Sequence, residues 1–189
     1  MVKLNVGCGW ECIEGWTNLD NTEKWQKVNY PLEFMDVTKP WEYEDNSVDY
    51  IYSAHMIEHI PEEDGLFALK EAYRTLKEGG VIRMTCPSRT FALSIMGQDN
   101  HPFVKNYCEK ILKRPLFQGA GAYIANRTLH MQGHVWVPTA EEFVEQLKKA
   151  GFTNAYSCEY GISTFDELNG ICLTDGVREY ESITVEGVK

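Results

Sequence analysis

The chain has little positive charge and no long apolar run. Its 189 residues include 18 basic and 28 acidic side chains, which gives a formal net charge of −10. Nucleic acids and anionic membranes are usually bound by a basic patch, and the densest basic stretch, residues 110–114, has three positive charges beside Glu109. No apolar run approaches the roughly 20 residues of a membrane-spanning helix. We therefore expect neither a nucleic-acid partner nor a membrane partner.

Repeats, low-complexity tracts and interdomain linkers are also absent from the sequence. Six cysteines occur, but Cys8 and Cys12 form a C-x3-C pair that no second pair matches, so the cysteines do not predict a zinc site. The sequence begins in a strand-like run without the pattern of a signal peptide. We expect a cytoplasmic protein with reduced thiols, and the sequence makes no prediction of its oligomeric state.

What remains is the composition of a globular protein. Hydrophobic residues make up 43% of the chain, which is enough for the packed core of one domain over residues 1–189. Strand-like and helix-like segments alternate, a pattern typical of an α/β fold with a parallel sheet and helical crossovers. The expected strands are 2–6, 16–20, 32–36, 47–52, 80–86, 152–159 and 181–186.

Two helices are expected from the signals at their ends. The first spans residues 61–77, with a proline in its first turn and Gly79 just past its end. The second begins after Thr139, which forms a capping box with Glu142, and it ends at Gly151.

A long insertion separates the fifth expected strand from the second helix. Residues 87–138 exceed the usual length of a connection in a compact domain, and they contain three of the five histidines, His101, His130 and His134. Long connections at the end of a sheet often carry function. We expect a lid that covers a site and selects the substrate, and additional core is the alternative.

Five segments follow one another in an order that is characteristic of a known family. They read LNVGCG (4–9), NLD (18–20), MDV (35–37), NSVDYIYSAHMIEHI (46–60) and EAYRTLKEGGVIRMTCP (71–87). These segments resemble the motifs of class I S-adenosylmethionine-dependent methyltransferases, and most closely the small predicted methyltransferase-like proteins associated with glycosyltransferases. The resemblance is specific over residues 3–87 and looser over 139–189.

This resemblance implies a fold and a cofactor. The fold is a Rossmann-like, doubly wound sheet of about seven strands whose last strand is antiparallel. The cofactor is S-adenosyl-L-methionine, lying over the carboxyl ends of the first, second and fourth strands.

The glycine turn and the acid that follows it have the chemistry of a nucleoside site. Gly7 and Gly9 leave the backbone bare beside a ligand, and Asp20 ends the next strand, where its carboxylate accepts hydrogen bonds from a ribose diol. A packing turn and a solvated acid are the alternatives. Only ten residues, 10–19, separate Gly9 from Asp20. This shortened first crossover has no room for the helix that binds the pyrophosphate of NAD, so a cofactor without phosphates is favoured.

The resemblance implies further contacts to the cofactor. Asp36 and the backbone N–H of Val37 are expected to receive the adenine ring. Asn5 and Cys8 belong to the segment of the glycine turn, and we expect both at the cofactor. Ser53 opens the segment toward which the methyl group points.

The same segment contains His55-x-x-Glu58-His59, which matches the inverted motif of some zinc hydrolases. Zinc ligation at that spacing needs a regular helix, yet Pro61 disfavours helical geometry at the preceding residue and permits one turn at most. No third ligand stands out in the sequence. We expect no metal, and a zinc-dependent hydrolase is the alternative function.

Histidines are the candidate catalytic residues. Methyl transfer from a sulfonium needs an aligned acceptor, and a base is optional. The resemblance places His55 on the substrate side or at the cofactor edge, and His130 and His134 are further candidates from the insertion; histidines satisfied by local contacts are the alternative. We expect methylation of a small-molecule or sugar-like acceptor. A non-catalytic binding protein that keeps the cofactor fold is a further alternative.

Overall fold

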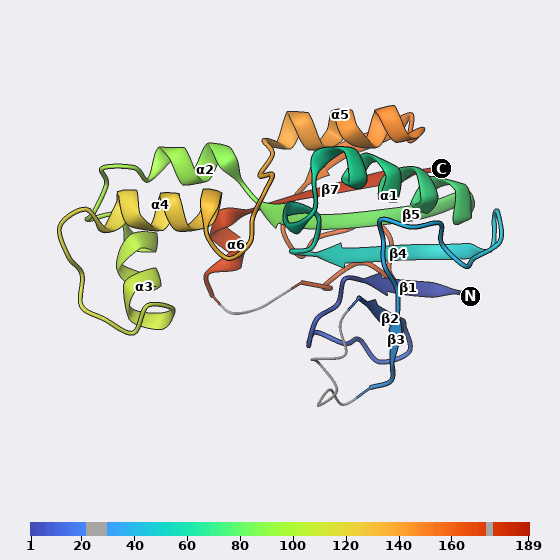
Figure 1. The fold of residues 1–189 in the computed structure, drawn as a ribbon, viewed down its shortest axis with the longest axis horizontal. Coiled ribbons are helices and arrows are strands. Elements are labelled where there is room, and N and C mark those ends of the chain that lie inside the picture. The colour runs from blue at the N-terminus through green and yellow to red at the C-terminus, as the bar shows by residue number, and fades with distance from the viewer. Residues whose placement is uncertain (22–29, 173–175) are drawn as a thin grey trace.

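A seven-stranded sheet forms the centre of the molecule. The computed structural model describes residues 1–21, 30–172 and 176–189, and its strands lie in the order β3-β2-β1-β4-β5-β7-β6 (Figure 1). β7 runs antiparallel to β5 and β6, and the remaining pairs are parallel, which confirms the predicted Rossmann-like sheet. The strands are β1 (Lys3–Val6), β2 (Thr17–Asp20), β3 (Leu32–Phe34), β4 (Val48–Ala54), β5 (Leu76–Pro87), β6 (Asn154–Cys158) and β7 (Ser182–Val188).

Two helices lie side by side on one face of this sheet. α1 (Glu62–Thr75) and α5 (Ala140–Ala150) bury their apolar faces in the main core (Figure 1). α5 begins with the predicted capping box: Oγ1 of Thr139 accepts from the N–H of Glu142, and Oε2 of Glu142 accepts from the N–H of Thr139. A smaller hydrophobic cluster joins two strands to irregular segments of the chain. It consists of Trp16, Tyr52, Val81 and Leu168.

The junction between α1 and β5 differs from the prediction. The helix ends at Thr75, and the strand begins at Leu76, whose side chain is fully buried in the core. Leu76 pairs with Val48, and the ladder then shifts register before Tyr50. The following glycines therefore belong to an irregular part of the strand, where a Cβ on Gly80 would lie 2.8 Å from a backbone oxygen.

A buried pair of asparagines holds the first crossover. Residues 7–16, all of them described, contain no helix, as the short spacing predicts. Nδ2 of Asn5 donates to Oδ1 of Asn18 and to the carbonyl of Glu11, each at 2.9 Å, and the N–H of Ile13 donates to Oδ1 of Asn18 at 2.8 Å. These hydrogen bonds replace the internal bonds of a helix, so the short connection is ordered without one.

The insertion folds into three helices with a hydrophobic cluster of their own. α2 (Arg89–Ser94), α3 (Pro102–Lys110) and α4 (Ala120–His130) gather beyond the carboxyl ends of β4 and β5 (Figure 1). Their cluster includes Val177, which precedes the short helix α6 (Arg178–Glu181). The insertion and the chain before β7 therefore form one unit at the end of the sheet.

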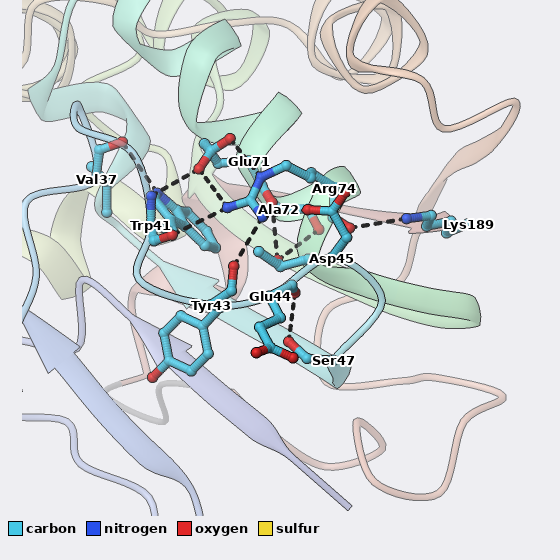
Figure 2. A network of polar contacts seen from close by, with 11 residues as sticks. Val37, Trp41, Tyr43, Glu44, Asp45, Ser47, Glu71, Ala72, Arg74 and Lys189 are labelled. Carbon is cyan, nitrogen blue, oxygen red and sulfur yellow. Dashed lines mark hydrogen bonds and ion pairs between the residues drawn. The ribbon is translucent and has the colours of Figure 1, made fainter.

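Arg74 on α1 fixes the connection between β3 and β4 (Figure 2). Its guanidinium donates five hydrogen bonds, to both carboxylate oxygens of Glu71, to Asp45, and to the carbonyls of Trp41 and Tyr43. Trp41 in turn donates from its backbone N–H to Glu71 at 2.8 Å and from its indole to the carbonyl of Val37 at 3.4 Å. All five donors of the arginine are thus used: three bind the loop, and two bind Glu71 on the same helix.

Among the described residues, no helix combines the length and the apolar character that crossing a membrane requires. The six cysteines are free thiols.

Candidate active site

A cavity opens at the carboxyl ends of the parallel strands. Its volume is about 590 Å³, within the range of roughly 300–1,000 Å³ for small-molecule sites. Its strand side comes from segments that follow the strands, namely residues 7–11, 20, 21, 35, 37, 54–56, 58–60 and 87. Its helix side comes from α3, α4, α6 and the turn after α4, through Tyr107, Ile111, Thr128, Gln132, His134, Val177, Arg178 and Glu181.

The glycine turn after β1 forms one wall of the strand side. Gly7 and Gly9 have φ values of 67° and 53°, which favour glycine. A Cβ on Gly7 would lie 2.2 Å from Cγ of Met56, so packing alone requires this glycine. The N–H of Gly9 donates to Oδ2 of Asp20 at 2.9 Å. The turn and the acid that the sequence singles out are therefore joined directly at the cavity.

Five of the eight predicted cofactor residues line the cavity: Gly7, Cys8, Gly9, Asp20 and Val37. Burial, together with the adjacent Cys12 thiol, raises the pKa of Cys8 far above its usual value. Cys8 is therefore a neutral thiol, which suits a wall of the cavity better than a nucleophile.

Asn5, Asp36 and Ser53 are not among the described residues that line the cavity. Asn5 holds the first crossover. Oδ1 of Asp36 accepts from the hydroxyl of Thr38 at 2.7 Å and from its N–H at 3.0 Å, and these hydrogen bonds lower the pKa of the Asp36 carboxyl. Ser53 is buried in β4, and its hydroxyl has no hydrogen-bond partner within the described part of the chain. Their contacts to a cofactor stay predictions.

The candidate catalytic histidines are separated by the fold. His55 and His134 line the cavity, whereas His130, the last residue of α4, is not among the described lining residues. His55 has a φ of 53°, and its Nε2 lies 3.0 Å from the hydroxyl of Ser182 on β7. It precedes a single 3-10 turn, η2 (Ile57–His59). The limit of one turn that Pro61 predicts is thus confirmed.

Glu58 lies at the centre of three histidines. Its side chain is 0% exposed. Oε1 is 3.3 Å from Nδ1 of His55 and 4.0 Å from Nε2 of both His59 and His134. Burial raises the pKa of the Glu58 carboxyl, but His55, the backbone N–H of Glu58 and His59 together more than reverse this, so that the pKa lies below its usual value. Glu58 is therefore a buried carboxylate at the cavity wall.

Two contacts fix the ring of His134 beside Glu58. Nδ1 lies 2.6 Å from the carbonyl of Thr128, and because a carbonyl only accepts, Nδ1 carries the proton in the neutral ring. The carbonyl of Glu58 accepts from the N–H groups of Val135 and Trp136 at 2.8 and 3.3 Å, which holds this segment against the turn. Burial lowers the pKa of His134. The unprotonated Nε2 thus faces the carboxylate.

Several lining residues are not predicted from the sequence. Trp10 and Glu11 directly follow the glycine turn, and this position in the sequence could have identified them as lining residues. Gln132 and Glu181 lie at the cavity because the end of α4 approaches α6, where Oγ1 of Thr128 donates to Oε2 of Glu181 at 3.4 Å. No local pattern identifies these two, since their approach depends on tertiary contacts.

Comparison with known proteins agrees with this geometry. A family model described as a methyltransferase domain matches residues 7–157. The phosphoethanolamine N-methyltransferase 2 of Caenorhabditis elegans is 38% identical over 63 residues, which span 33% of this chain and 13% of that protein.

Solved structures have the same fold. A SAM-dependent methyltransferase from Archaeoglobus fulgidus aligns with a TM-score of 0.63 at 15% identity, covering 99% of this chain and 85% of that one. A possible histamine N-methyltransferase from Thermotoga maritima aligns with a TM-score of 0.58 at 18% identity, covering 100% and 82%. The closer resemblance to glycosyltransferase-associated proteins stays a prediction. Because the family model matches most of its length, the chain belongs to the methyltransferase domain family and has the class I fold of S-adenosylmethionine-dependent methyltransferases.

Proposed function

We propose that this S-adenosylmethionine-dependent methyltransferase methylates a small polar molecule, with a hydroxyl or amine acceptor, in the cavity at the end of the sheet. The observation that carries the proposal is that one cavity joins the carboxyl ends of β1 to β4 to the polar surfaces of α4 and α6. A cofactor on the strand side and an acceptor on the helix side would meet inside it.

The strand side fits the cofactor. Gly9 offers open backbone, and Asp20 offers a carboxylate suited to the ribose hydroxyls, as in nucleotide folds. Met35 and Val37 supply apolar surface for a purine. Residues 7–16, which are all described, contain no helix. No helix N-terminus therefore follows β1 at the position where it would bind a phosphate. This arrangement favours a nucleoside cofactor without phosphates.

The chain's residues have two tasks in the transfer. When bound, S-adenosylmethionine supplies a methyl group on a positively charged sulfur. The cavity walls hold the acceptor in line with that methyl group and exclude water. His55 lies at the wall, where a histidine is able to take the proton that a hydroxyl or ammonium acceptor loses.

The helix side supports a small polar acceptor. Thr128, Gln132, Arg178 and Glu181 bring hydroxyl, amide and charged groups to one wall, a mixture that suits a sugar-like or aminated molecule. The relative from C. elegans carries the name of an enzyme that methylates a small amine. The net charge of −10 disfavours a nucleic-acid acceptor.

Calorimetry and product analysis test this function. We expect S-adenosylhomocysteine to bind with one site per chain, and mass spectrometry to detect a methylated product from a panel of small amines, amino alcohols and sugars incubated with S-adenosylmethionine. Binding of the nucleoside without any methylated product across the panel would favour the non-catalytic alternative. Absence of binding would contradict the proposal outright.

A further inference from the structure

We infer that Glu58, His59 and His134 form a binding site for a divalent transition-metal ion at the wall of the cavity. One ligand atom from each residue lies within 4.8 Å of the other two. A tetrahedral ion with bonds of about 2.1 Å separates its ligand atoms by about 3.4 Å. The 4.0 Å distances from Oε1 of Glu58 to both imidazole nitrogens are therefore close to those of a formed site.

The buried carboxylate of Glu58 supplies an independent observation. Within the described part of the chain, neither of its oxygens has a hydrogen-bond partner, although the side chain is 0% exposed. Buried side-chain oxygens almost always have a hydrogen-bond partner. The contact at 3.3 Å from His55 approaches one oxygen without making a hydrogen bond. A bound cation would satisfy the oxygens that the protein leaves open.

The imidazole ring of His134 is oriented as in histidines that bind a metal, with one nitrogen at a carbonyl and the other open. Its Nδ1 faces the carbonyl of Thr128 at 2.6 Å, and such a contact fixes the proton on Nδ1 and leaves Nε2 free to bind a metal. Nε2 points toward Glu58. The rings of His59 and His134 meet edge to face with centroids 4.9 Å apart, so both imidazoles approach the same carboxylate.

The ligand set defines the class of ion. Two imidazoles and one carboxylate are the protein ligands of many catalytic zinc sites, which keep a further position open for water or substrate, and imidazole also suits iron, nickel and copper. All three residues line the cavity, so an open position would face its interior. We therefore expect a Zn²⁺-like ion rather than Mg²⁺ or Ca²⁺, which prefer oxygen ligands.

This set differs from the zinc-hydrolase motif in the sequence. That motif would use His55 and His59 as ligands and Glu58 as the catalytic acid. In the structure, His55 lies outside the 3-10 turn and contacts Ser182. The third ligand, His134, lies 75 positions after His59 in the chain. The inferred site is thus not a helical hydrolase motif.

Cobalt titration tests the inference. Protein treated with a chelator and then dialysed should bind one Co²⁺ per chain, with visible d–d absorption typical of nitrogen and oxygen ligands, and Zn²⁺ should displace it. Glu58→Gln and His134→Ala should each weaken Co²⁺ binding at least tenfold. Glu58→Gln keeps the shape of the side chain, so circular dichroism is expected to match the wild type.

His101→Asn is the matched control. His101 accepts from the N–H of Phe103 as the N-cap of α3 and is not among the described residues that line the cavity, and asparagine is also a good N-cap. This variant should bind Co²⁺ as the wild type does. No saturable Co²⁺ binding, or equal affinity in wild type, Glu58→Gln and His134→Ala, would overturn the inference.

The result is separable from the proposed function. S-adenosylhomocysteine affinity is measured on the same samples, with and without chelator. Saturable Co²⁺ binding without methyl transfer supports the metal site and counts against the proposed function. Methyl transfer without Co²⁺ binding supports the proposed function and counts against the metal site.

Discussion

Asp20 has two roles at the cavity. Its Oδ2 accepts from the N–H of Gly9 at 2.9 Å, and its side chain also lines the cavity. The carboxylate therefore shapes the glycine turn and is presented to a ligand at the same time. A single residue thus couples the backbone of the first crossover to the surface on which we expect the ribose.

Replacing Asp20 by alanine should weaken binding of S-adenosylhomocysteine at least tenfold, as measured by calorimetry. Tenfold is about 1.4 kcal/mol, less than the roughly 1.5–3 kcal/mol of a hydrogen bond to a charged group. Asp99→Ala is the control, because Asp99 also accepts from backbone N–H groups, those of Gly119 and Gly121, but is not among the described lining residues. Equal affinity in both variants would exclude the ribose assignment.

Asp36 shows why the sequence alone does not tell which acids line the cavity. Asp20 and Asp36 each end a short expected strand, and both are predicted to contact the cofactor. Thr38, two residues after Asp36, donates two hydrogen bonds to one oxygen of its carboxylate. An acid followed at that spacing by threonine is a signal for a local turn. The neighbouring Val37, in contrast, lines the cavity.

At the scale of elements, the connection between β3 and β4 depends on one arginine. Arg74 binds both carboxylate oxygens of Glu71 and the carbonyls of the loop (Figure 2). The loop carries Val37, which lines the cavity. A helix on the face of the sheet thereby positions a residue at the end of the sheet.

Arg74→Lys should lower the free energy of unfolding by about 1–3 kcal/mol, as measured by urea denaturation at neutral pH. Lysine keeps the charge but cannot form the planar set of five donors. Arg89→Lys is the control, since Arg89 and Glu142 form a half-exposed surface pair whose loss costs about 0–1 kcal/mol. Similar losses in the two variants would contradict the role assigned to the Arg74 network.

The same network predicts a pH dependence. Hydrogen bonds from Arg74 lower the pKa of the Glu71 carboxyl. A lowered pKa in the folded state gives stability that is present above the unfolded-state pKa and is lost as the pH falls through the folded-state value. The difference in stability between wild type and Arg74→Lys should therefore shrink in acid.

The elements with strong local patterns could be predicted, and those that depend on distant contacts could not. The strands and α5 follow from alternation and from the capping box at Thr139. The helices of the insertion form their hydrophobic cluster with Val177, and no sequence pattern within residues 87–138 predicts that contact. His134 reaches Glu58 through backbone bonds from Val135 and Trp136. A third metal ligand at that separation is visible only in the folded chain.

At the scale of the molecule, the cavity lies between two hydrophobic clusters. The main core includes residues of the sheet, α1 and α5, and the second cluster belongs to α3, α4 and the chain before α6. The strand side of the cavity rests on the first cluster, and the helix side rests on the second. Ligands on the two sides should therefore stabilise different parts of the protein.

S-adenosylhomocysteine should stabilise the whole molecule, but it should protect the strand side of the cavity from hydrogen exchange more than the helix side. At about 100 times its dissociation constant, a ligand adds about 2.7 kcal/mol, which raises the Tm of a domain of this size by about 5–10 °C. In hydrogen exchange, we expect the greatest protection in residues 7–21 and 54–60, which follow β1 and β4 at the strand side. The amides of α3 and α4 should change less until an acceptor is added. Protection confined to α3 and α4 would mean that the nucleoside binds on the helix side, and the assignment of the two sides would then be wrong.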